Sequence, residues 1–308
     1  MVTLTFPDGA RREFPDAITG FDIAKGISPS LAKRTVAMAL DGTVTDLEIG
    51  GFCLAMRIKG ETPEEMAGFL DAVQQRLHHL PASDTPTVVL PSYNGARKLP
   101  VLTPLLALLL AREGVPVLVH GTPTESTRVF ASEVLLALDI PAQTAIQKIA
   151  NGEVVFTPTE LLLPALKRLL DVRRAVGLRN PAHSLVKIMS PCLGKSLVVS
   201  SYTHPEYAVS MAATFELIRA NAMLLRGTEG EVVADARRTP QMQGFIGGRQ
   251  ILLQEGVKGT LPSVPDLPKE VDAASTASYI QSVLAGNTPL PASIAQQVEH
   301  ILRLVSQL

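Results

Sequence analysis

The sequence predicts an α/β fold, in which a mainly parallel sheet is flanked by helices and preceded by a reduced helical subdomain and a small β-rich fragment. From residue 87 onward, short apolar segments alternate with longer segments of helical periodicity, which is typical of βαβ units. A helical segment precedes them at residues 47–80, and the first residues alternate apolar and polar side chains. We expect three parts, at residues 1–46, 47–80 and 81–308, with residues 160–190 contributing to the helical side of a cleft.

The composition supports a full core and excludes several classes of protein. Of 308 residues, 46% are hydrophobic and 19% charged, which argues against disorder. The net charge of −1 means that a nucleic-acid partner would have to be met by a local basic patch. Two cysteines, Cys53 and Cys192, do not make a disulfide framework. The longest apolar run, at residues 102–111, is roughly half of what a bilayer crossing needs, and the charged opening residues predict no secretory signal. We expect a cytoplasmic protein with no membrane partner.

The first eighty residues carry three local signals. Residues 2–6 and 11–14 flank Pro7-Asp8-Gly9, which predicts a β-hairpin. Residues 22–25 and 31–36 are expected to be short helical pieces. Residues 47–58 predict a mostly buried helix through Leu47, Ile49, Phe52, Leu54, Met56 and Ile58. A second helix begins at Thr62, where Thr caps, Pro63 takes the first position and acids follow.

The rest of the chain alternates strands and helices. We expect strands at residues 87–90, 115–119, 154–156, 196–200 and 222–225. We expect helices at residues 102–113, 127–138, 204–220, 272–284 and 292–308.

Two polar loops follow the first two of these strands, and ligands collect at the carboxyl ends of strands in parallel sheets. The two loops contribute the candidate residues Ser92, Asn94, Gly95, Arg97 and Lys98, and His120, Gly121, Thr127 and Arg128. The second loop is expected to lead into a helix N-terminus, where free N–H groups favour anions. The sequence therefore predicts a phosphate-binding surface, although ordinary polar loops remain an equal alternative.

A basic segment lies at residues 160–195. It holds seven cations against Glu160 and Asp171, a net of +5. Arg179, His183 and Lys187 within it are candidate phosphate-binding residues. The alternative is a solvated charged face.

No metal site, cofactor or catalytic residue is predicted. His78 and His79 are adjacent and point apart on a helix. Glu229, Glu231 and Asp235 could hold a hard cation through oxygen ligands. Acidic residues at these positions are equally well explained by an exposed segment that binds no metal.

Several separated motifs resemble one enzyme family. They are residues 48–70, PSYNGARK at 91–98, VHGTPTESTRV at 119–129, GLRNPAHS at 177–184, SSYTHPEY at 200–207 and RGTEGEV at 226–232. Over roughly residues 46–300 the chain resembles the anthranilate phosphoribosyltransferases, and most closely a divergent, DNA-binding branch. The resemblance implies a phosphoribosyltransferase fold of the nucleoside phosphorylase type.

The resemblance also implies which functional parts are missing. The enzymes bind phosphoribosyl pyrophosphate through a Gly-Thr-Gly-Gly-Asp run, where this chain has residues 92–96 with one glycine and the bulky Tyr93. Tyr93 is expected to intrude where backbone must approach pyrophosphate. The enzymes' magnesium-binding Asp-Glu pair has no counterpart in residues 227–232. Arg179 matches the family's substrate-side arginine, and His120-Gly121 also matches.

The first 46 residues resemble an incomplete TGS domain, the ubiquitin-like module of threonyl-tRNA synthetases. Its third strand would be residues 37–44, yet residues 39–48 would be a helix-turn-helix junction in the transferase family. Both cannot hold, and a hybrid chain is one explanation. Because the family pairs through N-terminal helices that this fragment replaces, we expect a possible homodimer to be weak or differently built.

Three functional hypotheses remain open. The first is a non-catalytic protein that binds nucleic acid without sequence preference, with Arg97, Lys98, Arg128, Arg179 and Lys187 on phosphates across a cleft. Its partner would be DNA, which includes single-stranded DNA, or RNA. The second is a phosphoribosyl or glycosyl transferase with an altered donor. The third is an RNA-associated fusion guided by the TGS-like fragment.

Overall fold

The computed structural model describes residues 2–5, 11–15, 29–259, 261, 264 and 267–308. Strands β1 (Val2–Thr5) and β2 (Arg11–Phe14) pair antiparallel, with Val2 opposite Phe14. The predicted hairpin is therefore confirmed in its strands, whereas its turn and the helical piece expected at residues 22–25 lie outside the described residues.

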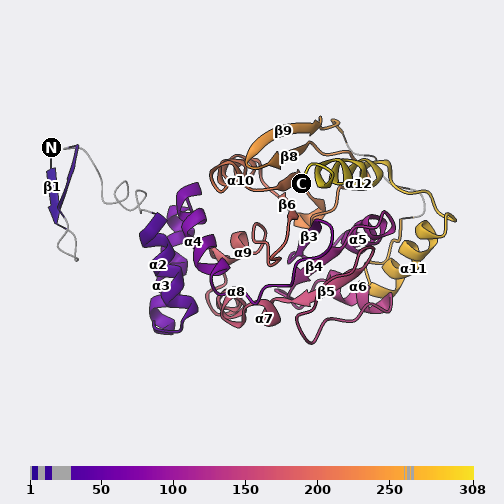
Figure 1. Ribbon diagram of the computed structural model, residues 1–308. Helices are drawn as coiled ribbons and strands as arrows, with labels where there is room; N and C mark the ends of the chain where they lie inside the picture. The colour runs from indigo at the N-terminus through magenta and orange to yellow at the C-terminus, as the bar shows by residue number, and fades with distance from the viewer. Residues whose placement is uncertain (1, 6–10, 16–28, 260, 262–263, 265–266) are drawn as a thin grey trace.

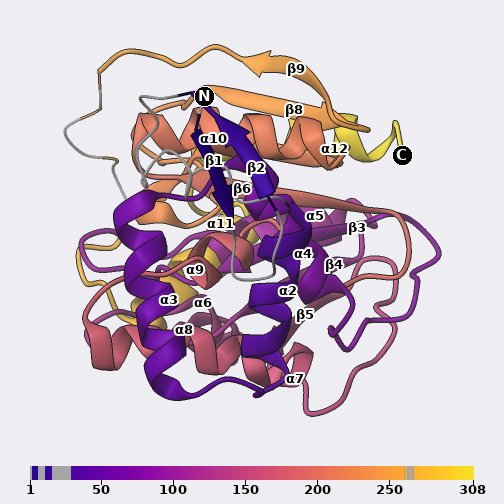
Figure 2. The same cartoon turned by 90° about the vertical axis from the view of Figure 1, so that its left-hand side faces the viewer.

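A helical bundle follows, and it starts earlier than expected. It comprises α2 (Pro29–Leu40), α3 (Asp46–Lys59) and α4 (Pro63–Gln74), and α2 packs directly against α4. Figures 1 and 2 show these helices together at one end of the molecule. The strand considered at residues 37–44 is wrong, because these residues end α2 and turn into α3. The helix-turn-helix interpretation of residues 39–48 is correct.

Local hydrogen bonds explain where two of these helices begin. Thr62 accepts from the backbone N–H of Glu65, whose carboxylate accepts from the N–H of Thr62. Thr45 and Glu48 make the same reciprocal pair at the start of α3. Each capping box satisfies backbone donors that a helix start leaves free, so the predicted helix start at Thr62 is confirmed.

Helix α3 is less buried than its apolar content predicts. Ile49, Cys53 and Met56 are buried, but Leu47 is 89% and Ile58 79% exposed. The expectation of a mostly buried helix is therefore wrong, because only one face of α3 meets the rest of the protein.

The main sheet of the described residues has seven strands in the order β5-β4-β3-β6-β7-β8-β9. The first five run parallel: β3 (Thr87–Ser92), β4 (Val117–Gly121), β5 (Val154–Pro158), β6 (Ser196–Tyr202) and β7 (Ala222–Arg226). This confirms the predicted mainly parallel sheet.

Two antiparallel strands at one edge were not predicted. They are β8 (Met242–Ile246) and β9 (Arg249–Gln254), joined by Gly247 and Gly248. Both glycines have positive φ, of 56° and 82°, as a two-residue hairpin turn requires. The Gly-Gly pair between two apolar segments was the sequence signal for this hairpin.

Helices cover both faces of the sheet (Figure 1). Alternate strand residues serve the two cores: Val89 packs on the side of the bundle, while Val88 and Leu90 pack on the opposite side. The bundle side also holds α7 (Thr159–Leu162), α8 (Pro164–Val176), α9 (Ala182–Leu185) and α10 (Pro205–Leu217). The opposite side holds α5 (Thr103–Arg112), α6 (Ala131–Ala137), α11 (Ala273–Leu284) and α12 (Ala292–Val305). Among the described residues, no helix has the length and apolar character needed to cross a membrane.

Candidate functional site

The two predicted loops meet at one edge of the sheet. Strands β3 and β4 are parallel neighbours whose last residues, Ser92 and Gly121, are paired. Beyond them, Ala96 and Val129 exchange two backbone hydrogen bonds, of 2.7 and 3.1 Å. The prediction that both loops gather at the carboxyl ends of these strands is confirmed.

The first loop closes around a buried carboxylate. Glu231, only 1% exposed, accepts at Oε1 from the backbone N–H groups of Asn94 (2.9 Å) and Gly95 (2.8 Å). Its Oε2 accepts from the hydroxyls of Ser92 (2.6 Å) and Thr103 (3.0 Å). The donors that were expected to face an external phosphate therefore face Glu231.

Glu229 occupies the second half of the same loop. Its Oε2 accepts from the backbone N–H groups of Arg97 (2.8 Å), Lys98 (3.0 Å) and Leu99 (3.3 Å). The side chains of Arg97 and Lys98 are exposed. They remain able to meet a partner, although their backbone donors are occupied.

Tyr93 does not obstruct the loop, and this corrects the expectation. Its ring is 4% exposed, and its hydroxyl bonds with His120 Nδ1 and Thr159 Oγ1, both at 2.8 Å. The side chain thus points into the core, and the group that fills the loop is Glu231.

His120 and Gly121 are both buried within the sheet edge. The His120 ring is fully buried, and burial lowers its pKa to about 3, so the ring is neutral near pH 7 and has no access to a phosphate. A Cβ on Gly121 would lie 2.0 Å from the carbonyl oxygen of Ser92. Glycine is therefore needed where β4 passes β3, and neither residue presents a surface for an anion.

Arg128 does not open a helix, which corrects a second expectation. Helix α6 begins at Ala131, and the N–H of Phe130 before it donates to Glu133. Arg128 instead donates to the carbonyls of Asn94 (3.1 Å) and Gly95 (3.4 Å). It braces the first loop, while Thr127 is exposed beside it.

Arg173, one of the seven cations of the basic segment, joins this corner. Glu125 bridges Arg128 (3.3 Å) and Arg173 (2.5 Å). Burial, followed by the charge of Arg173, lowers the pKa of Arg179. One carboxylate therefore faces three clustered guanidinium groups, which leaves a local excess of positive charge.

A cavity of about 580 Å³ lies between the bundle and the α/β domain. Of the predicted residues, Arg179, His183 and Lys187 line it, whereas those of the two loops do not. The wall also includes groups that the sequence did not single out: Arg57 and Lys59 from α3, Glu61, Glu206, and the rings of Tyr202, His204 and Tyr207. These come from two separated segments, residues 57–61 and 202–207, and no local pattern marks them together.

The charge of this cavity is mainly positive. Burial lowers the pKa of Lys187 to about 8, so this amine is still protonated near pH 7. Burial lowers the pKa of His183 to about 4, so His183 is neutral there and contributes no charge. Burial also raises the pKa of Glu61. Arg57 donates to the Tyr207 hydroxyl at 3.4 Å.

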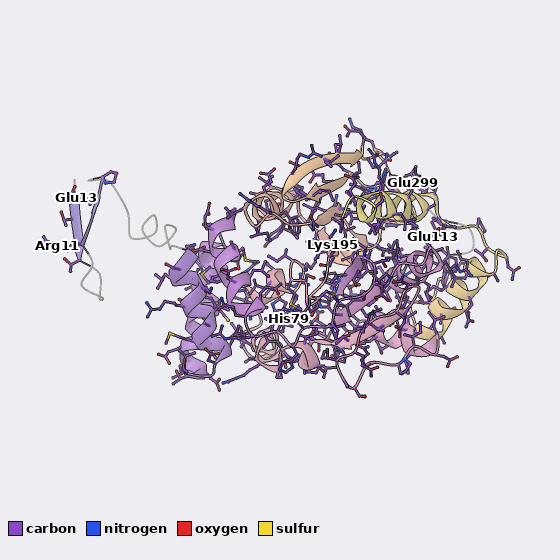
Figure 3. The ribbon with its side chains drawn as sticks, viewed as in Figure 1. Arg11, Glu13, His79, Glu113, Lys195 and Glu299 are labelled. Carbon is purple, nitrogen blue, oxygen red and sulfur yellow. The ribbon has the colours of Figure 1, made fainter. Side chains whose placement is uncertain are left out.

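Arg179, His183 and Lys187 of the basic segment line the cleft as expected, whereas Lys167, Arg168 and Lys195 make contacts elsewhere in the chain and do not line it. Lys167 pairs with Asp171, and Arg168 pairs with Asp46 of α3 at 2.5 Å. Lys195 donates to the carbonyl of Leu308 and lies away from the bundle (Figure 3).

The two adjacent histidines have separate partners. His78 Nδ1 bonds with the carbonyl of Leu161 (2.9 Å) and His79 Nε2 with that of Gln74 (3.0 Å). Within the part of the chain that the structure describes, no three His, Cys, Asp or Glu side chains are grouped to hold a metal ion.

Comparison with known proteins agrees with this fold. Residues 25–77 match the helical bundle domain of the glycosyl transferase family. Anthranilate phosphoribosyltransferase from Thermus thermophilus superposes with a TM-score of 0.69 at 20% identity, covering 90% of this chain and 84% of that one. The Saccharomyces cerevisiae enzyme in complex with PRPP and Mg gives a TM-score of 0.63 at 14% identity, with coverages of 91% and 84%. The architecture is that of an anthranilate phosphoribosyltransferase.

Sequence similarity is strong to one relative over nearly the whole chain. The uncharacterized protein YbiB of Escherichia coli (strain K12) is 38% identical over 286 residues, which are 91% of this chain and 89% of YbiB. The chain therefore belongs to the same family as YbiB, and it shares the fold of the anthranilate phosphoribosyltransferases. Separately, 46 residues are 74% identical to threonine–tRNA ligase of Rhodopseudomonas palustris, covering 15% of this chain and 7% of the ligase.

The groups named with the yeast enzyme do not fit these loops. A magnesium ion needs carboxylate oxygens that face it, but Glu231 accepts from N–H and O–H donors and Glu229 accepts from N–H donors. A diphosphate needs free donors, but the Ser92 hydroxyl and the N–H groups of Asn94, Gly95 and residues 97–99 are already used by the same two carboxylates. The carboxylates expected to hold a metal ion and the N–H and O–H groups expected to hold a diphosphate are therefore hydrogen-bonded to each other.

Proposed function

We propose that this protein binds nucleic acid without sequence preference and without catalysis, across the cleft between the bundle and the α/β domain. The observation that carries the proposal is the cavity, which Arg57 of α3 lines together with Arg179 and Lys187. Cations on both walls of a groove suit a phosphate backbone, whose contacts position the polymer but read no bases.

The aromatic groups of the cavity favour single strands. Tyr202, His204 and Tyr207 lie on the same wall, and the last two rings are 6.3 Å apart between centroids. Unpaired bases stack on such side chains, and the contact tolerates any base. Single-stranded DNA and RNA are therefore the preferred partners, and binding of duplex DNA is the measurement against which they are compared.

The same geometry supports a non-catalytic role. Transfer of a phosphoribosyl group relies on donors that stabilise developing charge, and in this chain Glu229 and Glu231 take those donors. The alternative of a transferase with an altered donor is tested beside binding, with phosphoribosyl pyrophosphate, magnesium and anthranilate. Turnover above background would refute the non-catalytic part of the proposal.

The first prediction concerns Arg97 and Lys98, whose side chains are exposed beyond the end of β3 and which we propose extend the basic surface of the cleft. We expect the double variant Arg97→Glu/Lys98→Glu to bind all sequences at least about tenfold more weakly near physiological salt. Two lost phosphate contacts should also reduce the slope of log affinity against log salt by roughly two. Fluorescence anisotropy with labelled single strands over a salt series measures both quantities.

The matched control is Lys33→Glu/Arg34→Glu on α2, which makes the same charge change on the bundle. It should have a much smaller effect. Equal binding by the Arg97/Lys98 variant and the parent would refute this surface, and no binding by the parent at low salt would refute the function. A larger loss in the α2 variant would instead indicate that α2 of the bundle contacts the nucleic acid.

We further propose that the chain forms a homodimer through an apolar stripe on α3. Leu47, Leu54 and Ile58 are 89%, 40% and 79% exposed, and their spacing of seven and four residues places them on one helix face. Leu31 and Met38 of neighbouring α2 are also about half exposed, at 52% and 48%. Because α2 is formed, the reason for expecting a weak dimer no longer holds.

We expect Leu47→Glu/Leu54→Glu to shift a dimer to monomer, because two buried charges per subunit would oppose association. Sedimentation velocity over a dilution series measures this change. Leu193→Glu is the control, since Leu193 is 68% exposed outside the bundle. A parent that is monomeric at every concentration, or a double variant that still dimerises, would contradict the proposal.

A further inference from the structure

We propose that Glu229 and Glu231 are built-in anions that occupy a phosphate-type site made by residues 92–99, and that removing them opens this site to diphosphate. The donors to the two carboxylates all lie in residues 92–103, and none of them lines the cleft. The proposal therefore stands or falls independently of nucleic-acid binding.

Glu231 sits in an environment made for an oxyanion. Both of its oxygens are fully used, each by two donors at 2.6–3.0 Å. Oε1 is held by the consecutive N–H groups of Asn94 and Gly95, and the φ of Gly95 is +67°. Consecutive N–H groups that converge at such a turn form an anion-binding concavity. A phosphate oxygen would satisfy the same donors.

Glu229 fills a second, adjoining concavity. One oxygen collects three consecutive N–H groups, from Arg97 to Leu99. The two carboxylates thus lie along one loop, as the two phosphates of a diphosphate would. Arg128 donates to the carbonyls of Asn94 and Gly95 on the same loop, which holds the loop in its donor-presenting form.

The backbone that presents the two acids is itself strained. Glu229 has a φ of +51°, a left-handed conformation that residues other than glycine rarely adopt. Gly230 has a φ of +89°, and a Cβ there would lie 2.0 Å from Asn94 Nδ2. Lys187 donates to the Gly230 carbonyl at 3.0 Å. The segment is thus held in a conformation that aims both carboxylates into the loop.

The chemistry therefore identifies a closed anion site rather than a lost one. The donors that would recognise a compact oxyanion are intact, and the chain supplies the anion. In the parent protein, phosphate must compete with a covalently tethered, buried carboxylate, so free diphosphate is excluded.

The test is substitution of the built-in anion with chemical rescue by inorganic pyrophosphate. Glu231→Ala leaves two N–H groups and two hydroxyls without an acceptor, so the variant should unfold at a lower temperature than the parent. Pyrophosphate at millimolar concentration should restore the unfolding temperature of this variant, compared with chloride at equal ionic strength. Titration calorimetry should show at least about tenfold tighter pyrophosphate binding than in the parent, the size expected from charge-assisted hydrogen bonds.

Gln297→Ala is the matched control. Gln297 is also fully buried beside this segment, bonding to the N–H of Ala234 and the carbonyl of Val232. Its removal leaves one donor and one acceptor, which is no anion site, so pyrophosphate should restore nothing. This control also measures any general stabilisation by the anion.

If Glu231→Ala does not fold, Glu229→Ala is the second variant, because Glu229 is only half-buried. It should gain weaker pyrophosphate binding through the N–H groups of residues 97–99. Folded variants that bind pyrophosphate no better than the parent would overturn the proposal, as would a parent that binds it equally well.

Discussion

Replacing His120 with asparagine should make the stability of the protein distinctly less sensitive to acid. The His120 ring is fully buried and burial lowers its pKa to about 3, whereas a histidine in the unfolded chain titrates near 6.5. Between these pH values the unfolded chain binds a proton that the folded chain does not, so the free energy of unfolding falls as pH falls. For His120 this loss is roughly 3 kcal/mol at pH 4.

Asparagine retains an amide that can bond with the Tyr93 hydroxyl but does not titrate, so its effect on the pH dependence can be isolated. Urea unfolding of parent and variant at several pH values between about 7 and 4 provides the measurement. His300→Asn is the control, because His300 on α12 is partly exposed. Protonation of its ring therefore costs the folded protein less free energy than protonation of the His120 ring. Parallel stability curves for parent and His120→Asn would show that the ring is protonated in the folded protein.

Replacing Gly227 with alanine should destabilise the protein by about 3 kcal/mol. A Cβ at Gly227 would lie 1.6 Å from the carbonyl oxygen of Glu231, and a backbone atom cannot move aside as a flexible side chain can. The segment would have to open, and Glu231 would then withdraw from the N–H groups of Asn94 and Gly95. We therefore expect faster hydrogen exchange at these two amides as well as a lower free energy of unfolding.

Gly50→Ala is the matched control with the opposite sign. Gly50 lies inside α3, and a Cβ there meets no atom within 4 Å. Alanine should stabilise the helix by roughly 0.5–1 kcal/mol because it restricts the unfolded chain. A Gly227→Ala protein with parental stability and parental exchange at Asn94 would contradict the tight packing inferred for this segment.

Features that depend on nearby residues were predictable from the sequence. The start of α4 follows from Thr62, Pro63 and Glu65, whose hydrogen bonds span three residues. The parallel strands follow from apolar segments of strand length, and the hairpin strands from alternation around an Asp-Gly turn. The hairpin of β8 and β9 was equally local, and its Gly247-Gly248 signal was overlooked.

The candidate site was predictable only as far as strand order. The sequence placed Arg97, Lys98 and Arg128 near one sheet edge, because parallel strands end on the same side. It did not show that Arg128 braces a loop. Nor did it show that Arg168 is paired with Asp46, which is 122 residues away.

The sequence by itself determined the α/β class, the helix start at Thr62, the parallel strands and the two polar loops, one of which follows β3 and the other β4. Only the tertiary structure decided that Glu231 is buried in the first loop, that Tyr93 points into the core, and that Arg57, Arg179 and Lys187 line one cavity. The physical reason is the range of the interactions. A cap or a strand pattern is settled within a few residues, whereas Glu231 meets its donors across 128 to 139 residues of chain, and only packing of the whole sheet brings them together.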